Sequence, residues 1–307
     1  MTVARYHTPV LIDEVVRYAE GRSRIVDCTV GGGGHAARLA TSGVRLLAID
    51  RDAEAISAGR RRIGTADVMW LNASFADPIA LAAISEFRPD FVLFDLGVSG
   101  HQLDSSERGF SFKPGTVLDM RMSPGEGPTA AHLLNSLDQQ ELARVFREYG
   151  DERRASRLAA AVVRRRRKQP LATSDDLVNA IREVAGPRSG PHVFARLFQA
   201  VRIALNDEIG SLGRALPSVL DALVPGGVIA VISYHSGEDR VVKRFFGEWS
   251  RACVCPPRTP ACTCRGRPLG AASPRKPIYP TALEVEMNPR ARSAKLRIFR
   301  KSDENKG

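Results

Sequence analysis

The sequence predicts an α/β protein whose Rossmann-like parallel sheet is interrupted by an inserted helical domain. Through the first hundred residues, short apolar runs alternate with amphipathic helical patterns, the layout of parallel βαβ units. A long polar loop and then helical patterns with Thr, Ser or Asp near several starts fill residues 106–212. A glycine turn and a buried apolar run, "LVPGGVIAVIS", then resume the sheet. We therefore expect a discontinuous sheet domain of residues 1–105 and 213–307, with 106–212 inserted as a helical substrate-recognition domain.

The first βαβ unit carries a glycine-rich loop in "IVDCTVGGGGHAARL". Read as G-x-G-x-x-[GA], it supplies Gly31, Gly33 and Ala36, and Asp50 ends the next apolar run, "VRLLAID". This spacing is typical of folds that bind an adenosine-containing cofactor, with the later carboxylate on the ribose. A tight glycine turn without a ligand is the alternative.

Carboxylates end three of the predicted strands, at Asp27, Asp50 and Asp95. Ligands of open α/β sheets bind at the carboxyl edge of the strands, so three acids there indicate a site. An NAD-dependent enzyme would need a second mononucleotide-binding half, which the helical block does not resemble. Carboxylates would also repel a pyrophosphate but attract a cationic sulfonium. These observations favour S-adenosylmethionine as the cofactor.

Composition indicates a polyanionic partner. The 307 residues carry a formal net charge of +11 and a sequence pI near 9.9, which suits nucleic acid better than a small neutral substrate. No apolar run approaches a bilayer span, and "MTVARYHTPVLIDEVV" lacks a signal-peptide core, so we expect a cytoplasmic protein without a membrane partner. A homodimer is compatible with the sequence.

Ten motifs in order give the chain a resemblance to the bacterial 16S rRNA (cytosine-N4)-methyltransferase family, of the small-subunit rRNA methyltransferase H type. They are "HTPVLIDEVV", "GGGGH", "AIDRD", "FDLGVSGHQLD", "RGFSF", "LDMRM", "YGDER", "FQAVRIALNDE", "ISYHSGEDRVVK" and "NPRARSAKLR". The resemblance implies a class I S-adenosylmethionine-dependent methyltransferase fold. It also implies methylation of the exocyclic N4 amine of a cytidine in the decoding region of 16S rRNA, as naked RNA or in an assembled small subunit. An NAD-dependent oxidoreductase and a non-catalytic RNA-binding ribosome assembly factor remain the alternatives.

The resemblance also implies cofactor contacts at matching positions. They are Gly33, Gly34, His35, Asp50, Phe75, Asp95 and Gln102. For His35 the alternative is a helix-start residue that faces solvent, and for Phe75 it is an ordinary core residue. The chain departs from the family pattern at Gly100, where a serine is common, at Tyr234, where the family has Phe, and at Gly237, where it has Leu.

Methyl transfer to a cytosine amine needs an acceptor for the proton that N4 loses. The candidate catalytic residues are Asp95, Ser233 and His235, the last two at the end of a predicted strand. Tyr234 is a candidate to stack on an extruded base. For His235, a structural hydrogen bond at a helix N-terminus is the alternative. We expect no metal among these catalytic residues.

Two basic segments are candidate phosphate contacts. From Arg144 to Lys168 there are ten basic and three acidic residues, and the C-terminal segment supplies Arg290, Arg292 and Lys295. A solvated helix face is the alternative explanation of the first segment. "KLRIFRK" also fits a last strand, with Leu296 and Ile298 facing inward.

Four cysteines gather in "CVCPPRTPACTC", as Cys253, Cys255, Cys262 and Cys264. Four thiolates on a short hairpin could close a tetrahedral zinc site. The C-x-C spacing is tighter than the usual C-x-x-C knuckle, so spacing alone favours free or reversibly oxidised thiols. The fifth cysteine, Cys28, is expected to be a small buried residue rather than a nucleophile.

Overall fold

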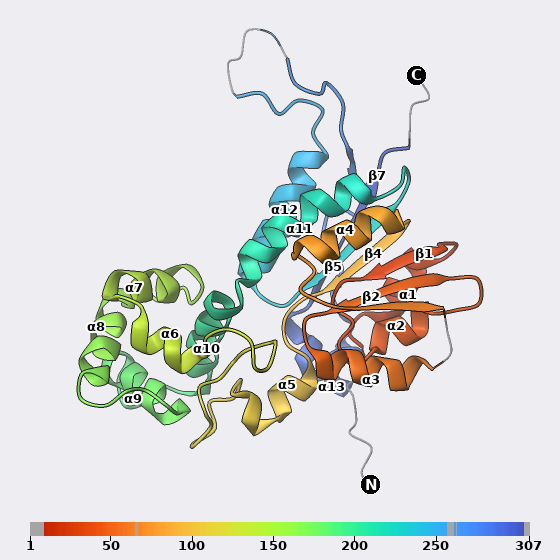
Figure 1. Ribbon diagram of the computed structural model, residues 1–307. Coiled ribbons are helices and arrows are strands. Elements are labelled where there is room, and N and C mark those ends of the chain that lie inside the picture. The colour runs from red at the N-terminus through yellow and green to blue at the C-terminus, as the bar shows by residue number, and fades with distance from the viewer. Residues whose placement is uncertain (1–8, 65–66, 257–260, 262, 304–307) are drawn as a thin grey trace. The chain divides into compact units, whose positions relative to one another are not determined.

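The computed structural model describes residues 9–64, 67–256, 261 and 263–303. The chain divides into two compact units. The first unit combines Met1–Gly97 with Ile209–Gly307, and the second is Val98–Glu208, coloured from yellow to green in Figure 1. The sequence places the corresponding boundaries at 106 and 212.

The first unit contains a seven-stranded sheet in the order β3-β2-β1-β4-β5-β7-β6. Its strands are β1 Arg24–Asp27, β2 Arg45–Asp50, β3 Val68–Asn72, β4 Phe91–Asp95, β5 Val228–Ser233, β6 Gly270–Ala272 and β7 Lys295–Lys301. The first five are parallel, whereas β7 runs antiparallel to both β5 and β6. The sheet predicted to resume after the helical block does so, because β5 pairs with β4.

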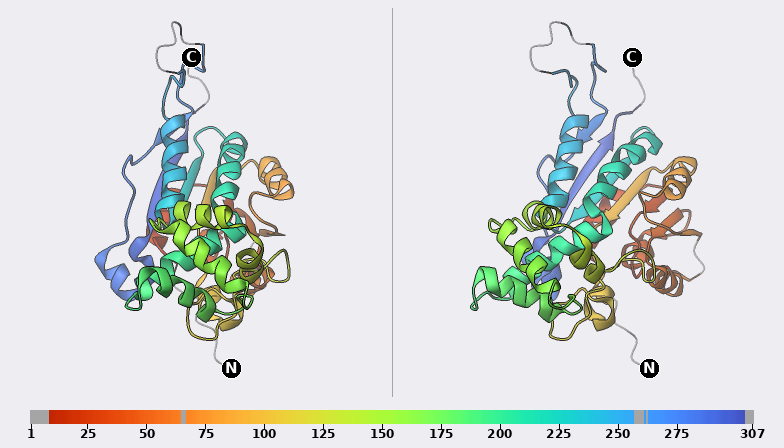
Figure 2. Two further views of the ribbon diagram at one scale, coloured as in Figure 1. Left: turned by 90° about the vertical axis from the view of Figure 1, so that its left-hand side faces the viewer. Right: turned by 60° about the vertical axis from the view of Figure 1, so that its left-hand side comes forward.

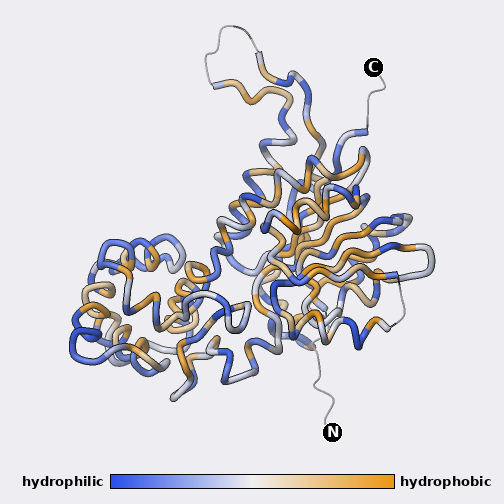
Figure 3. Tube along the Cα trace, viewed as in Figure 1, coloured by the Kyte–Doolittle hydropathy of each residue, from blue (hydrophilic) through white to orange (hydrophobic). Residues whose placement is uncertain are grey.

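Helices cover both faces of this sheet, so its central strands are apolar on both sides. In β4, Phe91 and Leu93 contribute to one core cluster, and Val92 and Phe94 to the other. One face carries α1 Ile12–Ala19, α2 Gly34–Leu39 and α3 Ala53–Ile63, and the other α4 Pro78–Phe87, α11 Glu208–Ala222 and α12 Ser236–Trp249. Figure 3 shows these strands as continuous hydrophobic segments. The period-two alternation therefore divides one apolar run between two cores.

The C-terminal part of the chain completes the first unit. Short helices α13 Ala282–Met287 and η2 Pro289–Ser293 precede β7. Leu296 and Ile298 are buried, which confirms the predicted inward-facing strand. In Figure 2, α12 and β7 lie side by side, and the rings of Phe246 and Phe299 are 5.3 Å apart.

The second unit is helical, as the periodicity predicts. It contains α5 Gly100–Asp104, η1 Ser106–Arg108, α6 Ala130–Ser136, α7 Gln139–Glu148, α8 Ala155–Arg166, α9 Ser174–Ala185 and α10 Pro191–Asn206. Thr129, Asp138 and Thr173 cap three of these helices with their side chains. The long polar loop before α6 is held by two buried polar residues. Arg108 donates to the Met122 carbonyl at 3.0 Å, and the Asn206 side chain bonds the same stretch of backbone.

Among the described residues, no helix is both long and apolar enough to cross a bilayer.

Candidate active site

Three carboxylates lie at one edge of the sheet, as predicted. Asp27, Asp50 and Asp95 are the last residues of β1, β2 and β4, which are neighbouring parallel strands. Burial, together with the charges of Asp95 and Asp50, raises the pKa of Asp27 to about 8, although a hydrogen bond from the Thr29 amide opposes the shift. Burial therefore holds this edge partly protonated, and a cation that binds there would favour the ionised carboxylates.

The glycine loop lies between β1 and α2, and the structure gives a reason for its glycines. Gly33 has a φ of +76° at the start of α2, and an added Cβ there would lie 3.0 Å from the Cα of Gly59 on α3. A Cβ on Gly34 would lie 2.7 Å from Cγ of Pro9. These two glycines are therefore needed, at least in part, because the loop packs closely against Gly59 and Pro9 of the same chain.

Asp50 ties the end of β2 to this loop. Its Oδ2 accepts a hydrogen bond from the Gly31 amide at 2.8 Å, and its Oδ1 accepts one from the Asp52 amide at 2.9 Å. Burial raises the pKa of Asp50 to about 6 despite these two bonds. Each carboxylate oxygen keeps a further lone pair, so Asp50 can still accept hydrogen bonds from a ligand.

Asp95 is the centre of a hydrogen-bonded group. Its Oδ1 accepts from the Tyr234 hydroxyl at 2.8 Å, and its Oδ2 lies 3.5 Å from Nδ1 of His35. Its backbone amide donates to Oγ1 of Thr29 at 2.6 Å. The side chain is 25% exposed, so the carboxylate can meet a ligand while both oxygens are held in place.

The orientation of His35 is set by a backbone carbonyl. Nε2 of His35 lies 2.9 Å from the Val10 carbonyl oxygen, which can only accept, so Nε2 carries a proton and Nδ1 faces Asp95. His35 is 5% exposed and is therefore not the solvent-facing helix-start residue of the alternative interpretation. Burial raises the pKa of Asp95, while His35 and Tyr234 oppose that shift.

The end of β5 places Ser233, Tyr234 and His235 in different environments. Ser233 is buried, and its hydroxyl donates to the Lys295 carbonyl at 3.4 Å. His235 is the N-cap of α12, where its Nδ1 accepts from the Glu238 amide at 3.3 Å. Of the three, only Tyr234 has a hydrogen bond to Asp95 among the contacts described here.

Phe75 and Gln102 lie in separate units. Phe75 is partly buried and meets Phe94 edge to face, with ring centroids 5.3 Å apart. Gln102 belongs to α5 of the second unit, where its Oε1 accepts from the Ser99 amide at 3.0 Å. At Gly237, a Cβ would lie 3.1 Å from Nδ1 of His235, so the leucine common in the family would crowd the cap.

Two residues of this edge were not predicted. Thr29 bonds the Asp95 backbone, and Glu238 accepts from the Tyr234 amide at 2.8 Å. Glu238 stands three residues after His235, which is the spacing of a capping box and could have identified it. Thr29 has no comparable signal, because its contact is to a residue 66 positions away.

The basic segment from Arg144 to Lys168 divides into two classes. Arg164 and Arg165 form ion pairs with Glu183, and Arg166 donates to two backbone carbonyls at the end of α6. These side chains hold the second unit together. The second class consists of the other exposed basic side chains of the segment, which belong to Arg144, Arg147, Arg153, Arg154, Arg157, Arg167 and Lys168. In the C-terminal segment, Arg290 and Arg292 are exposed, whereas Nζ of Lys295 lies 3.5 Å from a carboxylate oxygen of Asp239.

Comparison with known proteins gives near-complete matches. A family model described as the MraW methylase family matches residues 4–302. The chain is 50% identical over 299 residues to "Ribosomal RNA small subunit methyltransferase H" of Gemmatimonas aurantiaca, covering 96% of this chain and 95% of that protein. Proteins of the same name from Symbiobacterium thermophilum and Heliobacterium modesticaldum are 44% and 43% identical, over 96% of this chain and 96% and 98% of theirs.

Proposed function

The chain belongs to the MraW methylase family and is an S-adenosylmethionine-dependent methyltransferase, and on that premise we propose that it methylates the N4 amine of a cytidine in the decoding region of 16S rRNA. The observation that carries the choice of chemistry is the set of three carboxylates at one sheet edge. A cationic sulfonium is attracted by them, whereas the pyrophosphate of NAD would be repelled, which disfavours the oxidoreductase. We also propose that the protein acts in the cytoplasm, where bacterial ribosomal subunits assemble.

The residues present fit such a cofactor. Asp50 has the lone pairs to accept the ribose hydroxyls, and Phe75 has a partly exposed ring that suits adenine. The loop of Gly33, Gly34 and His35 offers backbone to the methionine moiety. Asp95 completes the proposed set within the first unit, and the contact at Gln102 is what the family resemblance implies. Bound there, S-adenosylmethionine supplies an electrophilic methyl group on a positively charged sulfur.

We propose Asp95 as the acceptor of the proton that N4 loses. Its carboxylate is partly exposed, and Tyr234 and His35 hold its two oxygens in fixed directions. A hydrogen bond from N4 to this carboxylate would increase the nucleophilicity of the amine and orient it, and orientation can contribute about 7–11 kcal/mol. Ser233 and His235 bond the backbone, which supports a positioning role at the same strand end.

The test is methyl transfer to a defined nucleoside. The full chain is incubated with methyl-labelled S-adenosylmethionine and either free 16S rRNA or small subunits that lack the modification, and the RNA is then digested to nucleosides. Labelled N4-methylcytidine is the expected product, and the better substrate identifies the form recognised. Label on a different nucleoside would contradict the N4 assignment, and no label with either substrate would favour the non-catalytic assembly factor.

We further propose that exposed arginines of the second unit contact RNA phosphates. Replacing Arg153 and Arg157 together by alanine is expected to weaken rRNA binding and to reduce the slope of log affinity against log salt by about 1.4, if each contacts one phosphate of a single strand. Filter binding across a salt series measures this slope. Arg61→Ala with Arg62→Ala removes the same charge from exposed positions on α3. An equal loss in that control would mean that overall charge, not this surface, governs binding.

A further inference from the structure

The segment between α12 and β6 extends away from the sheet, and hydrogen bonds join its two ends. The Leu269 amide donates to the Trp249 carbonyl at 2.8 Å, and the Ala272 amide donates to Oγ of Ser250 at 3.1 Å. Farther out, Nη2 of Arg265 donates to the Arg251 carbonyl at 2.9 Å. These bonds join the outgoing limb, which begins with Trp249, Ser250 and Arg251, to the returning limb, which contains Arg265, Leu269 and Ala272. The next described residues, 252–256, 261 and 263–264, are exposed or only half-buried, so they have no apolar core of their own.

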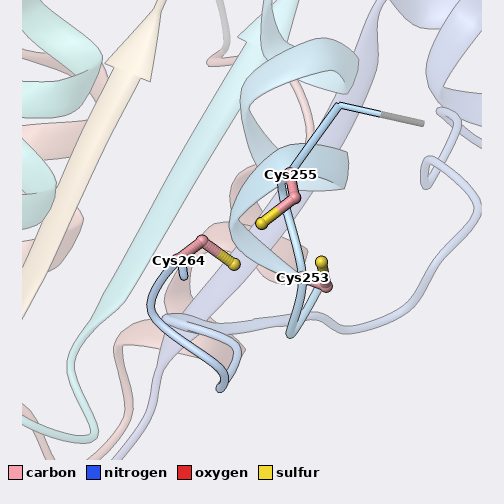
Figure 4. Close-up of side chains that lie close together, drawn as sticks. All are labelled: Cys253, Cys255 and Cys264. Carbon is pink, nitrogen blue, oxygen red and sulfur yellow. The ribbon is translucent and has the colours of Figure 1, made fainter. Parts of the chain in front are cut away.

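Three cysteine thiols meet beyond this base. Cys253 and Cys255 come from the outgoing limb and Cys264 from the returning limb, and their sulfur atoms all lie within 4.8 Å of one another. Figure 4 shows the three side chains turned toward a common centre. Among the described residues, none of the three is joined in a disulfide. Cys262 lies outside the described residues.

A backbone hydrogen bond to sulfur is the second observation. The Val254 amide, between Cys253 and Cys255, donates to Sγ of Cys264 at 3.3 Å. An amide that donates to sulfur stabilises the thiolate, and such bonds from outside the ligand set orient metal-binding side chains. Sγ of Cys264 also lies 3.9 Å from the Ala252 carbonyl, toward which a thiol proton can point. Metal binding would release that proton.

We propose that Cys253, Cys255 and Cys264 bind one Zn²⁺ ion that cross-links the two limbs of this segment. Ligand sulfurs of a tetrahedral site with Zn–S bonds of about 2.3 Å are about 3.8 Å apart, so the thiols need only a small movement. An all-sulfur donor set favours zinc over magnesium or calcium. Where burial does not stabilise a short segment, such a metal does. The ion is structural, it occupies a place outside the Asp95 group, and a fourth ligand completes its coordination.

Metal content of the full chain tests the proposal. Protein purified under reducing conditions without chelator is expected to contain one zinc per chain by elemental mass spectrometry. Each of Cys253→Ser, Cys255→Ser and Cys264→Ser should lower that content at least tenfold. Cys28→Ala is the matched control, because Cys28 is buried in the sheet core and should be replaceable without loss of zinc. Reconstitution with Co²⁺ should give sulfur-to-metal charge-transfer absorption in wild type and not in the three variants.

A variant could also lose zinc because it unfolds, so a second experiment uses only the wild-type protein. A chelator removes the metal, circular dichroism checks that the fold persists, and Zn²⁺ is then titrated back against a coloured indicator. One site per chain that protects three thiols from alkylation supports the proposal. Failure to take up zinc while the thiols are reduced, or Co²⁺ spectra without charge-transfer bands, would overturn it and leave reversible oxidation as the explanation of the cluster.

Discussion

Asp95→Asn is expected to lower kcat for methyl transfer by a factor of about 10²–10⁴, the usual contribution of a general base. Asparagine keeps the shape of the side chain and an oxygen that accepts from the Tyr234 hydroxyl, which lies 2.8 Å from Oδ1 of Asp95. It cannot accept the proton that N4 loses. Single-turnover transfer of labelled methyl to rRNA measures the effect, and filter binding shows whether RNA affinity is unchanged.

Two comparisons decide what that loss means. Tyr234→Phe removes one hydrogen bond to Asp95 but leaves the carboxylate, so its effect on kcat should be smaller.

Because burial raises the pKa of Asp95 and the ionised form is required, the single-turnover rate of wild type should rise with pH through that ionisation. The residual rate of Asp95→Asn should not. Full activity in Asp95→Asn would rule out this acceptor, and unchanged complementation by an inactive variant would favour the assembly factor.

The fold was largely predictable because local patterns determine it. Apolar runs with a carboxylate at the end predicted β1, β2 and β4, and the resumed run predicted β5. The family resemblance carried by the ten motifs is confirmed by matches over nearly the whole chain. The three-residue strand β6, Gly270–Ala272, was not predictable. Its sequence, GAA, has little strand propensity, and it forms because β7 offers it an edge.

The candidate site was predictable in its location more than in its contacts. Any parallel sheet brings Asp27, Asp50 and Asp95 to one edge, so their neighbourhood follows from strand order. The bond from Tyr234 to Asp95 joins residues 139 positions apart and depends on the register of β4 with β5. The sequence left His235 with two possible roles, and its capping bond depends on where α12 begins. Such contacts arise from tertiary packing, which spacing along the chain does not encode.

Asp27 is expected to make the stability of the first unit fall as pH rises. Burial raises its pKa from 3.8 to about 8, so between these values the folded state holds a proton that the unfolded chain has released. Stability is then greatest below pH 4 for this group and is lost up to about pH 8, by about 1.4 kcal/mol per pH unit. Asp27→Asn is neutral throughout and keeps an oxygen for the Thr29 amide, which lies 3.1 Å away. Its advantage over wild type should grow by about 4 kcal/mol from pH 5 to pH 8.

Denaturant unfolding without cofactor measures this, because both tryptophans, Trp70 and Trp249, belong to the first unit and their fluorescence reports its unfolding. Asp50→Asn is the matched control at the same edge. The pKa of Asp50 is raised only to about 6, so any such advantage should stop growing near that pH. Two variants that diverge from wild type over these different ranges would show that the edge is held partly protonated until a cation arrives. Parallel stability profiles for wild type and Asp27→Asn would mean that Asp27 is ionised in the folded protein, so that its negative charge is present before a sulfonium binds.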